Sequence, residues 1–207
     1  MLNKYARAAV TTLFSPLARL LLRLGVGPDA VTIVGTLGVC LSALLLYPRG
    51  ELFWGTIAVT VFVFSDTLDG IMARAQGRSG PWGAFLDSCL DRFGDAAVFG
   101  GLVVWFARGG DSELTAGLAL LCLVLGGIVP YIRAKAEGVG MTAAVGIAER
   151  SDRLVAVLVT TGFVGLGLPT EVLTVVLALL ALASAVTIGQ RMATVRRQVL
   201  AAAADRP

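Results

Sequence analysis

Residues 66–91 read DTLDGIMARAQGRSGPWGAFLDSCLD, and this stretch decides how the rest of the chain is interpreted. It carries four aspartates at helical spacing, within two of the most hydrophobic parts of the sequence: Asp66, Asp69, Asp87 and Asp91. Carboxylates are costly close to the hydrocarbon of a bilayer, so ionisable residues in membrane segments are candidates for functional sites. Four of them need a common neutralising partner, and a pair of divalent metal ions is the simplest one.

The composition around this stretch indicates an integral membrane protein. Of the 207 residues, 57% are hydrophobic and only 15% are charged, whereas a soluble domain has roughly a quarter charged residues. The absence of histidine excludes a His-based triad and a His-ligated zinc site. Cys40, Cys89 and Cys122 are scattered through apolar runs, which is typical of small buried hydrophobic residues and not of a disulfide framework.

Six apolar stretches follow an amphipathic start, and the sequence therefore predicts an all-α integral membrane fold. Each stretch approaches the roughly 20 residues that a membrane-spanning helix needs. The six predicted transmembrane helices are 30–47, 53–74, 82–107, 113–136, 153–168 and 170–190. The fifth is short and can be kinked or partly interfacial. We expect an amphipathic interfacial helix at 1–25, a six-helix transmembrane domain at 26–195 and a cytoplasmic tail at 196–207.

The distribution of basic residues predicts the orientation of these helices. With the N-terminus inside, 15 of the 17 Lys and Arg residues fall on one side, and Arg49 and Arg108 fall on the other. Cytoplasmic loops carry such an excess, so both termini and the four aspartates are expected at the cytoplasmic side of the cell (inner) membrane. Part of the excess is interpreted as topology and contact with anionic lipid, with no bearing on nucleic acid.

The spacing of the aspartates predicts that they face one volume. The two members of each pair are three or four residues apart, so each pair lies on one helix face. A short connection around 75–81 makes the two helices antiparallel neighbours. Oxygen-only ligation suits Mg²⁺ or Mn²⁺, and two such ions form the usual clamp for displacement at phosphorus. Pairing of the aspartates with Arg74, Arg78 and Arg92 is the alternative. Asp95 continues the second stripe and is either a support of the site or a structural partner of an arginine.

The pattern D-x2-DG-x2-AR-x8-G-x3-D-x3-D, which we call the aspartate frame, resembles the signature of the CDP-alcohol phosphotransferase family. Residues 66–91 match every fixed position. The resemblance extends over the chain, since members have an amphipathic N-terminal helix and six spanning helices. It implies transfer of a substituted phosphate from a CDP-linked lipid to an alcohol, with release of CMP. It also implies that the four aspartates hold two divalent metals, and that Asp91 is the general base toward the acceptor hydroxyl.

The same resemblance implies a set of residues around the nucleotide of the CDP-lipid. That set is Asp29, Thr32, Asp66, Asp69, Gly70, Arg74, Ser79 and Gly83. Gly70 would let the nucleotide approach the helix backbone. Many family members carry Pro-Asn where this chain has Pro28-Asp29, and Asp29 can still accept a hydrogen bond from the cytosine amino group. Alternatively, Asp29 is only the N-cap of the first spanning helix.

The aspartate frame does not choose the acceptor alcohol, so other residues must. Five basic residues at predicted cytoplasmic helix ends can converge on one pocket: Arg133, Lys135, Arg150, Arg153 and Arg191. Guanidinium groups bind phosphate oxygens in a fork, so this cluster suits an acceptor that already carries a phosphate. Membrane anchoring is the alternative. The patterns YIRAKAE at 131–137 and AERSDR at 148–153 resemble those of bacterial phosphatidylinositol phosphate synthases, which use inositol phosphate.

The resulting prediction is metal-dependent transfer of a phosphatidyl group from CDP-diacylglycerol to inositol phosphate. The nearest alternative is a phosphatidylglycerol phosphate synthase, because glycerol 3-phosphate also carries a phosphate. A cation-conducting transporter belongs to a different class, and the sequence has none of the inverted repeats or broken midplane helices that favour one. A homodimer is expected from the resemblance, with Gly126, Gly127 and the Ala-rich sixth helix permitting close packing.

Overall fold

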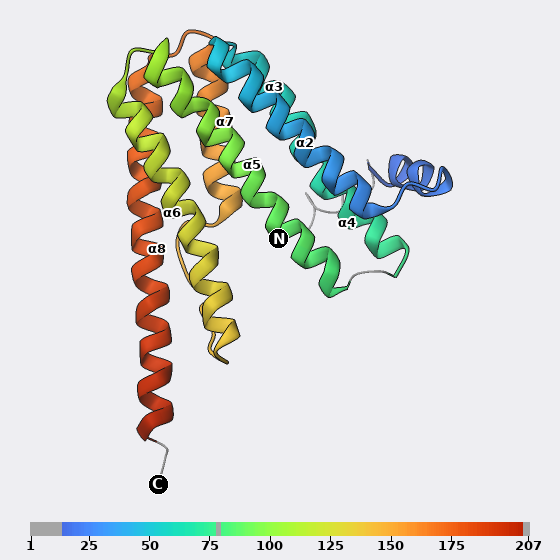
Figure 1. Ribbon diagram of the computed structural model, residues 1–207, viewed down its shortest axis with the longest axis vertical. Coiled ribbons are helices and arrows are strands. Elements are labelled where there is room, and N and C mark those ends of the chain that lie inside the picture. Colours follow the sequence, from blue (N-terminus) through green and yellow to red (C-terminus); the bar gives the residue numbers. More distant parts are fainter. Residues whose placement is uncertain (1–13, 78–79, 205–207) are drawn as a thin grey trace, which may run out of the picture.

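The computed structural model describes residues 14–77 and 80–204, and every regular element in this part of the chain is helical (Figure 1). The principal helices are α2 (Pro28–Leu46), α3 (Leu52–Val63), α4 (Ser65–Ala75), α5 (Pro81–Arg108), α6 (Glu113–Gly138), α7 (Arg150–Gly165) and α8 (Thr170–Ala204). A short 3-10 helix, Tyr47–Arg49, follows α2, and residues 14–23 form a further helical segment. The predicted all-α class is confirmed.

The main core lies where α2, α3, α5, α6, α7 and α8 meet, and it is built mostly from small and aliphatic side chains. Tyr47 is fully buried, and its hydroxyl lies 3.1 Å from Oγ1 of Thr56. The backbones of α2 and α5 approach closely, because a Cβ at Gly101 would lie 2.7 Å from the carbonyl oxygen of Ala43. α6 and α8 run side by side, and α2 and α3 form a second pair (Figure 1).

Within the described residues, four helical spans are long and apolar enough to cross a membrane: Pro28–Arg49, Leu52–Ala75, Glu113–Gly138 and Thr170–Ala204. α5 is 28 residues long but carries four charged residues between its start and its middle: Asp87 and Asp91 of the aspartate frame, Arg92 and Asp95. α7 has only 16 residues, fewer than the roughly 20 that a spanning helix needs. Four of the six predicted spans therefore have the required length and composition, and membrane crossing by α5 and α7 stays a prediction.

The predicted helix at 53–74 is divided at Phe64 into α3 and α4. Ser65 follows the break, and its hydroxyl donates to the carbonyl oxygen of Phe62 at 2.6 Å. Serine side chains compete with the helical backbone in this way. A side chain at Gly35 of α2 would collide with the Ser65 hydroxyl, so α2 lies tightly against the junction. The two aspartates of the first pair therefore belong to α4, a short helix that follows directly after α3.

Two helix boundaries also differ from the prediction. α7 begins at Arg150, about one turn early, because Glu149 and Asp152 form a capping box in which the Glu149 amide donates to Asp152 Oδ2 at 3.3 Å. α8 has 35 residues, which is about 52 Å at 1.5 Å per residue and longer than the hydrocarbon core of about 30 Å. It runs well past the end of α6 (Figure 1), so the predicted tail at 196–207 starts inside a helix.

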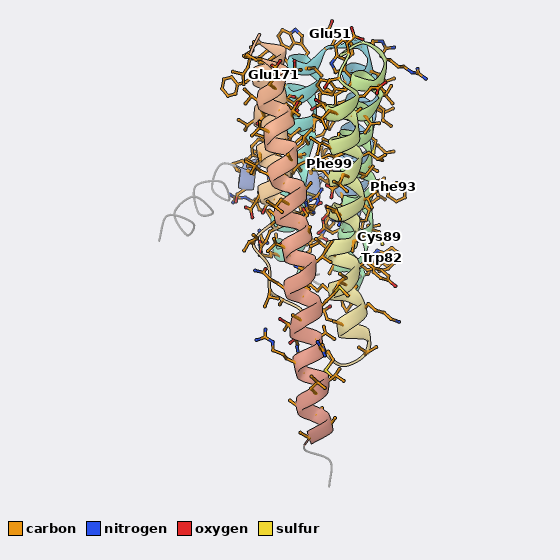
Figure 2. All side chains as sticks on the ribbon, turned by 90° about the vertical axis from the view of Figure 1, so that its left-hand side faces the viewer. Glu51, Trp82, Cys89, Phe93, Phe99 and Glu171 are labelled. Atoms are coloured by element: carbon orange, nitrogen blue, oxygen red, sulfur yellow. The ribbon has the colours of Figure 1, made fainter. Side chains whose placement is uncertain are left out.

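The described part of the N-terminal segment, residues 14–23, packs on α4. Ala18 and Met72 are buried at this contact, within a small second hydrophobic cluster. Leu20 and Arg19 are exposed on the rest of the segment. Residues 1–13 lie outside the described part, so the amphipathic interfacial helix stays a prediction. Glu51 and Glu171 lie at one end of the bundle, and Trp82 lies further along it (Figure 2).

A candidate active site between α2, α4 and α5

A cavity of about 790 Å³ lies where α4 meets the beginnings of α2 and α5. Its size is within the range of ligand pockets, which is roughly 300–1,000 Å³. Nine residues that the sequence predicted to act line this cavity: Asp29, Thr32, Asp69, Gly70, Arg74, Gly83, Asp87, Asp91 and Arg150. The side chain of Asp66 and residue Ser79 lie outside the described part of the chain. The cavity therefore brings together most of the predicted site from four helices.

Helix geometry explains how α5 presents its share of the cavity lining. Gly83, Asp87 and Asp91 are four residues apart, so they recur once per turn on one face. Pro81 occupies the first helical position after the N-cap Gly80 and fixes where this stripe begins. A Cβ at Gly83 would meet no atom within 4 Å. The helix surface beside the two aspartates is therefore open to a bound group.

Asp69 is the most deeply placed carboxylate of the cavity. It is buried on α4, and the hydroxyl of Thr32 lies 2.6 Å from its Oδ2. The same hydroxyl lies 3.1 Å from the carbonyl oxygen of Pro28, one turn earlier in α2. Because Asp69 carries no proton when ionised, Thr32 is the donor to it. Thr32 thus orients the Asp69 carboxylate from the neighbouring helix.

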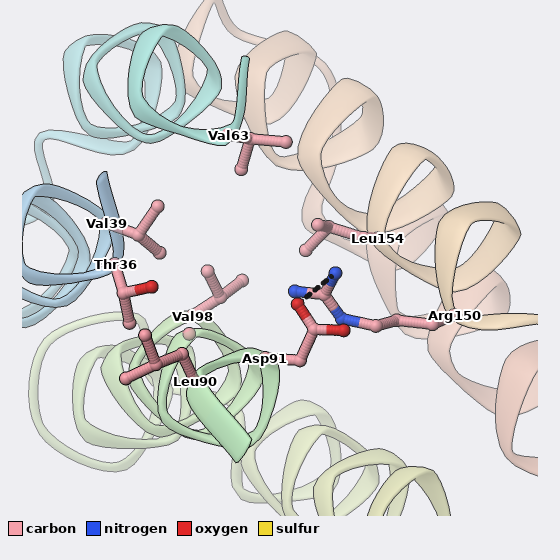
Figure 3. A pocket seen from close by; sticks show the side chains of 9 residues that line it. Thr36, Val39, Val63, Leu90, Asp91, Val98, Arg150 and Leu154 are labelled. Carbon is pink, nitrogen blue, oxygen red and sulfur yellow. Dashed lines mark ion pairs between the residues drawn. The ribbon is translucent and has the colours of Figure 1, made fainter. Parts of the chain in front are cut away.

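Asp91 forms an ion pair with Arg150, the first residue of α7 (Figure 3). Arg150 Nη1 lies 2.8 Å from Asp91 Oδ1, and Arg150 Nε lies 3.0 Å from Asp95 Oδ1. One guanidinium therefore bridges two carboxylates that are one turn apart on α5. Of the two interpretations of Asp95, the structure supports partnership with an arginine. A small hollow beside this pair is lined mainly by apolar groups such as Val39 and Leu154.

Arg92, one of the arginines that the alternative interpretation pairs with the aspartates, joins the same cluster. Its Nη2 lies 3.7 Å from Asp91 Oδ2 and 3.6 Å from Asp95 Oδ2. Its Nε and Nη1 are buried without a hydrogen-bond partner in the described part of the protein. Arg92 and Arg150 approach the same two carboxylates, so the α5–α7 contact is strongly polar. For Asp91, the alternative of pairing with an arginine therefore describes one contact in the structure.

The donor chemistry of the cavity suits a divalent metal ion. Asp69, Asp87 and Asp91 offer only oxygen ligands, which hard cations prefer, and all three line the cavity. Within the described residues, no three acidic, histidine or cysteine side chains are arranged so as to hold a metal ion. The side chain of Asp66 is not among them, and one oxygen of Asp91 is engaged by Arg150. The carboxylate oxygens of the cavity are therefore suitable ligands for a divalent metal ion, and the complete site with four carboxylates stays a prediction.

The predicted acceptor-binding cations have different surroundings. Of the five, Arg150 lines the cavity. Arg153 is buried and donates to the carbonyl oxygens of Ala148 and Gly126 at 3.3 and 3.4 Å, so it ties α7 to α6. Arg191 of α8 is also buried, and it donates to the carbonyl oxygens of Val145 and Val129 at 2.8 and 2.6 Å.

The remaining two cations of that set lie on α6 and are exposed. Arg133 pairs with Glu137 at 2.9 Å along the same helix, and Lys135 lies between them in the sequence. Arg150 therefore lies beside the aspartates. Arg153 and Arg191 instead connect neighbouring segments through hydrogen bonds to backbone carbonyl oxygens. Phosphate binding by the full set stays a prediction.

Trp82 lines the cavity but was not predicted from the sequence as a site residue. It lies in the first turn of α5, and its indole Nε1 donates to Asp29 Oδ2 at 3.0 Å. The structure also places the N-cap of α2 at Gly27, with Asp29 inside the first turn. The alternative that Asp29 caps this helix is therefore wrong. The available signal was the position of an aromatic residue directly before Gly83 of the aspartate frame.

Comparison with known proteins assigns these features to a family. The sequence profile described as CDP-alcohol phosphatidyltransferase matches residues 26–146, which include the whole aspartate frame. The chain belongs to the CDP-alcohol phosphatidyltransferase family. The family predicted from the aspartate frame is thereby confirmed, and this CDP-alcohol phosphatidyltransferase is a transferase of phospholipid synthesis.

Relatives of this CDP-alcohol phosphatidyltransferase resemble it over nearly its full length. It is 51% identical over 204 residues to the phosphatidylinositol phosphate synthase of Streptomyces avermitilis, across 96% of this chain and 84% of that protein. Its fold matches the crystal structure of Mycobacterium tuberculosis phosphatidylinositol phosphate synthase with CDP-DAG bound, with a TM-score of 0.85, 41% identity, and coverage of 89% and 94%. The structure of that synthase in complex with manganese and citrate gives a TM-score of 0.84 at 42% identity, with 88% of each chain covered.

Proposed function

We propose that this enzyme transfers the phosphatidyl group of CDP-diacylglycerol to a hydroxyl of inositol phosphate, giving phosphatidylinositol phosphate and CMP. The observation that carries the chemistry is the placement of Asp69, Asp87 and Asp91 around one cavity that Arg150 also lines. The choice of acceptor is supported by relatives of 42–51% identity, all named phosphatidylinositol phosphate synthase.

In the proposed reaction, Asp91 accepts the proton of the acceptor hydroxyl. The acceptor oxygen forms a new bond to the phosphorus that carries diacylglycerol, and the bond from that phosphorus to the phosphate oxygen of CMP breaks. CMP leaves with the electron pair of that bond. General-base assistance of this kind typically contributes about 10²- to 10⁴-fold in rate. Arg150 is well placed for the acceptor phosphate, because it lies beside Asp91.

We assign the metal to the carboxylates of the aspartate frame. Two Mg²⁺ or Mn²⁺ ions would be held by Asp66, Asp69, Asp87 and Asp91, and the related synthase has been solved in complex with manganese. When bound, the metal neutralises the pyrophosphate and the charge on the leaving CMP. The protein's own part is to hold these carboxylates in place, as Thr32 does for Asp69.

The nucleotide subsite that we propose lies along the rest of the cavity. The residues assigned to it are Asp29, Thr32, Asp66, Asp69, Gly70, Arg74, Ser79 and Gly83. Open space beside Gly83 and the related structure with CDP-DAG bound support this assignment. For the acceptor phosphate we retain Arg133, Lys135, Arg150, Arg153 and Arg191, with Arg150 as the member next to the base.

We infer that the chain crosses the membrane six times, with both termini and the cavity cytoplasmic. Residues 1–25 would form the interfacial helix, 26–195 the transmembrane domain and 196–207 the tail. The excess of Lys and Arg in the connections on one side supports this arrangement. A lipid substrate and a soluble acceptor require such a cavity at the membrane boundary. A homodimer is part of the proposal, with exposed small residues of α6 and α8 such as Gly127 as the packing surface. Gly126 does not belong to that surface, because it is buried against Arg153 within the chain.

The test is CMP release by the purified enzyme in detergent or liposomes. CDP-diacylglycerol and Mn²⁺ or Mg²⁺ are supplied with inositol phosphate, glycerol 3-phosphate, free inositol or serine in separate reactions. We expect CMP with inositol phosphate, and a lipid product that carries two phosphates. Release with glycerol 3-phosphate alone would assign the enzyme to phosphatidylglycerol phosphate synthesis. Absence of CMP with every acceptor would refute the transferase reaction.

A further inference from the structure

A hydrogen bond joins the first turns of α2 and α5 at the cavity. The indole Nε1 of Trp82 lies 3.0 Å from Asp29 Oδ2, and the two residues are 53 positions apart in the sequence. Both side chains line the same cavity. This bond therefore fixes the Asp29 carboxylate from the neighbouring helix, in the lining of the cavity.

Packing does not account for this bond. The Trp82 side chain is 61% exposed, and Asp29 is exposed as well. Asp29 does not cap α2, because Gly27 is the N-cap and no side-chain cap bond is present there. Hydrogen bonds between exposed groups add little to stability. An exposed tryptophan that holds an exposed carboxylate at a cavity is better explained by a ligand.

The chemistry of the pair indicates which ligand group it suits. An indole has one N–H and no acceptor, whereas an ionised carboxylate has two oxygens with about four acceptor sites. Among the described residues, Trp82 is the one donor to the Asp29 side chain, so the carboxylate keeps acceptor capacity in a fixed orientation. An amino group on a planar base would satisfy it. Uracil has a carbonyl oxygen in the place of this amino group. A carbonyl oxygen and an ionised carboxylate are both acceptors, so no hydrogen bond can form between them.

We propose that Trp82 is a positioning residue for nucleobase selection: it orients Asp29 so that the carboxylate accepts the exocyclic amino group of cytosine and disfavours uracil. This proposal rests on the proposed use of a CDP-linked substrate and names how this chain selects its base. A site that hydrogen-bonds a particular group discriminates strongly against analogues without that group, because its own polar atoms are then left unpaired. Trp82 acts through Asp29 and makes no contact with the reacting phosphates in this proposal.

The chain offers matched variants for a test. Trp82→Phe removes the N–H donor and keeps an aromatic ring. Phe85→Leu is the control, because Phe85 lies against Trp82 with a ring-centroid distance of 5.9 Å, is also 61% exposed, and does not line the cavity. Asp29→Ala removes the proposed acceptor. The double variant of Asp29→Ala and Trp82→Phe completes a mutant cycle.

The measurement is calorimetric binding of CMP and UMP to each full-length protein in detergent with Mn²⁺. We expect the wild type to prefer CMP. Trp82→Phe should weaken CMP binding by about five- to tenfold, the effect of one ordinary hydrogen bond, because the carboxylate is kept and only its orientation is lost, and it should leave UMP binding unchanged. Phe85→Leu should change neither. In the Asp29→Ala background, Trp82→Phe should have no additional effect.

Three results would overturn the inference. Equal loss of CMP and UMP binding in Trp82→Phe would mean that the larger indole ring, and not its bond to Asp29, matters. The same loss in the Asp29→Ala background would exclude action through Asp29. The same loss in Phe85→Leu would indicate general aromatic anchoring at the membrane interface. Failure of the proposed function is distinguishable, because the wild type would then release no CMP from CDP-diacylglycerol with any acceptor.

Discussion

Arg150 of α7 and Asp91 of α5 form an ion pair, with Arg150 Nη1 2.8 Å from Asp91 Oδ1. Asp95, one turn deeper on α5, holds the same guanidinium through Nε at 3.0 Å. The pair connects the proposed base with a cation that also lines the cavity. Since Arg150 is the first residue of α7, the start of that helix is coupled directly to the aspartate frame.

Asp95→Asn is predicted to destabilise the protein measurably. Asp95 is buried, and its loss leaves two arginines, Arg92 and Arg150, with one carboxylate fewer between them. Removing one partner of a buried pair costs about 3–5 kcal/mol, and we expect about 2–4 kcal/mol because Arg150 is partly exposed. Thermal unfolding in detergent measures the change. Glu137→Gln is the control, because its exposed pair with Arg133 should contribute less than about 0.5 kcal/mol. Equal effects of the two substitutions would contradict the prediction.

Arg150→Ala is predicted to raise KM for the acceptor more than KM for CDP-diacylglycerol. Loss of a charge-assisted contact to a phosphate should raise KM for inositol phosphate by roughly 10- to 100-fold, and Arg150→Lys should restore part of it. KM for CDP-diacylglycerol should change far less. Steady-state kinetics with each substrate varied in turn provide the measurement, and Arg196→Ala, an exposed residue beyond the cavity, is the control. An unchanged acceptor KM would remove Arg150 from the acceptor site.

Thr32→Val is predicted to weaken metal binding through Asp69. Valine has the shape of threonine but cannot donate to Asp69 Oδ2, where the hydroxyl now lies at 2.6 Å. Loss of a hydrogen bond to a metal ligand typically lowers affinity 10- to 100-fold, and we expect roughly tenfold. Thr32→Ser keeps the hydroxyl and should bind normally. Electron paramagnetic resonance titration with Mn²⁺ measures both affinity and the number of ions per chain, which we expect to be two. Equal Mn²⁺ affinity in the valine and serine variants would show that the bond to Asp69 is irrelevant to metal.

The sequence predicted the helices well because apolar runs and their polar breaks are local signals. It missed the division at Phe64, because that break depends on one serine hydroxyl bonding back to Phe62 and on α2 lying against it. It also placed the start of α7 too late, although Glu149 and Asp152 are a readable capping box. In both cases the residues that set the helix boundary are visible in the sequence, but a prediction based on hydrophobicity alone does not take them into account.

In the site, the arrangement of the aspartate frame was predictable because residues three or four apart lie on the same face of a helix. The surroundings of the basic residues were not predictable from the sequence. Arg153 and Arg191 look like Arg150 in the sequence, yet they donate to backbone carbonyls in the interior. Which arginine meets a carboxylate and which meets a carbonyl depends on contacts between helices far apart in the chain. Trp82 was missed for the same reason, because its partner Asp29 is 53 positions away.

Asp91→Asn is predicted to abolish turnover while retaining CDP-diacylglycerol binding. Asparagine has nearly the same shape but cannot accept the acceptor proton, so kcat should fall by about 10²- to 10⁴-fold. Asp111→Asn, in the exposed turn after α5, is the matched control and should keep full activity. CMP release gives kcat, and lipid binding is measured separately by calorimetry. Substantial residual turnover in Asp91→Asn would exclude Asp91 as the base.

Six crossings and four crossings differ in where the connections on either side of α6 lie, and this difference can be measured. With α5 and α7 in the membrane, the turn at Asp111 lies on the outer side with Arg49, and the connection at Ala144 lies on the cytoplasmic side. If those two helices stay at the interface, both positions change sides. Single cysteines at 111 and 144, in a chain whose native cysteines are replaced, are labelled with an impermeant maleimide in right-side-out and inside-out vesicles. We expect position 111 to react in right-side-out vesicles and position 144 in inside-out vesicles, because the basic residues fix the cytoplasmic side. The reverse pattern would leave α5 and the aspartate frame at the membrane surface and reduce the number of crossings to four.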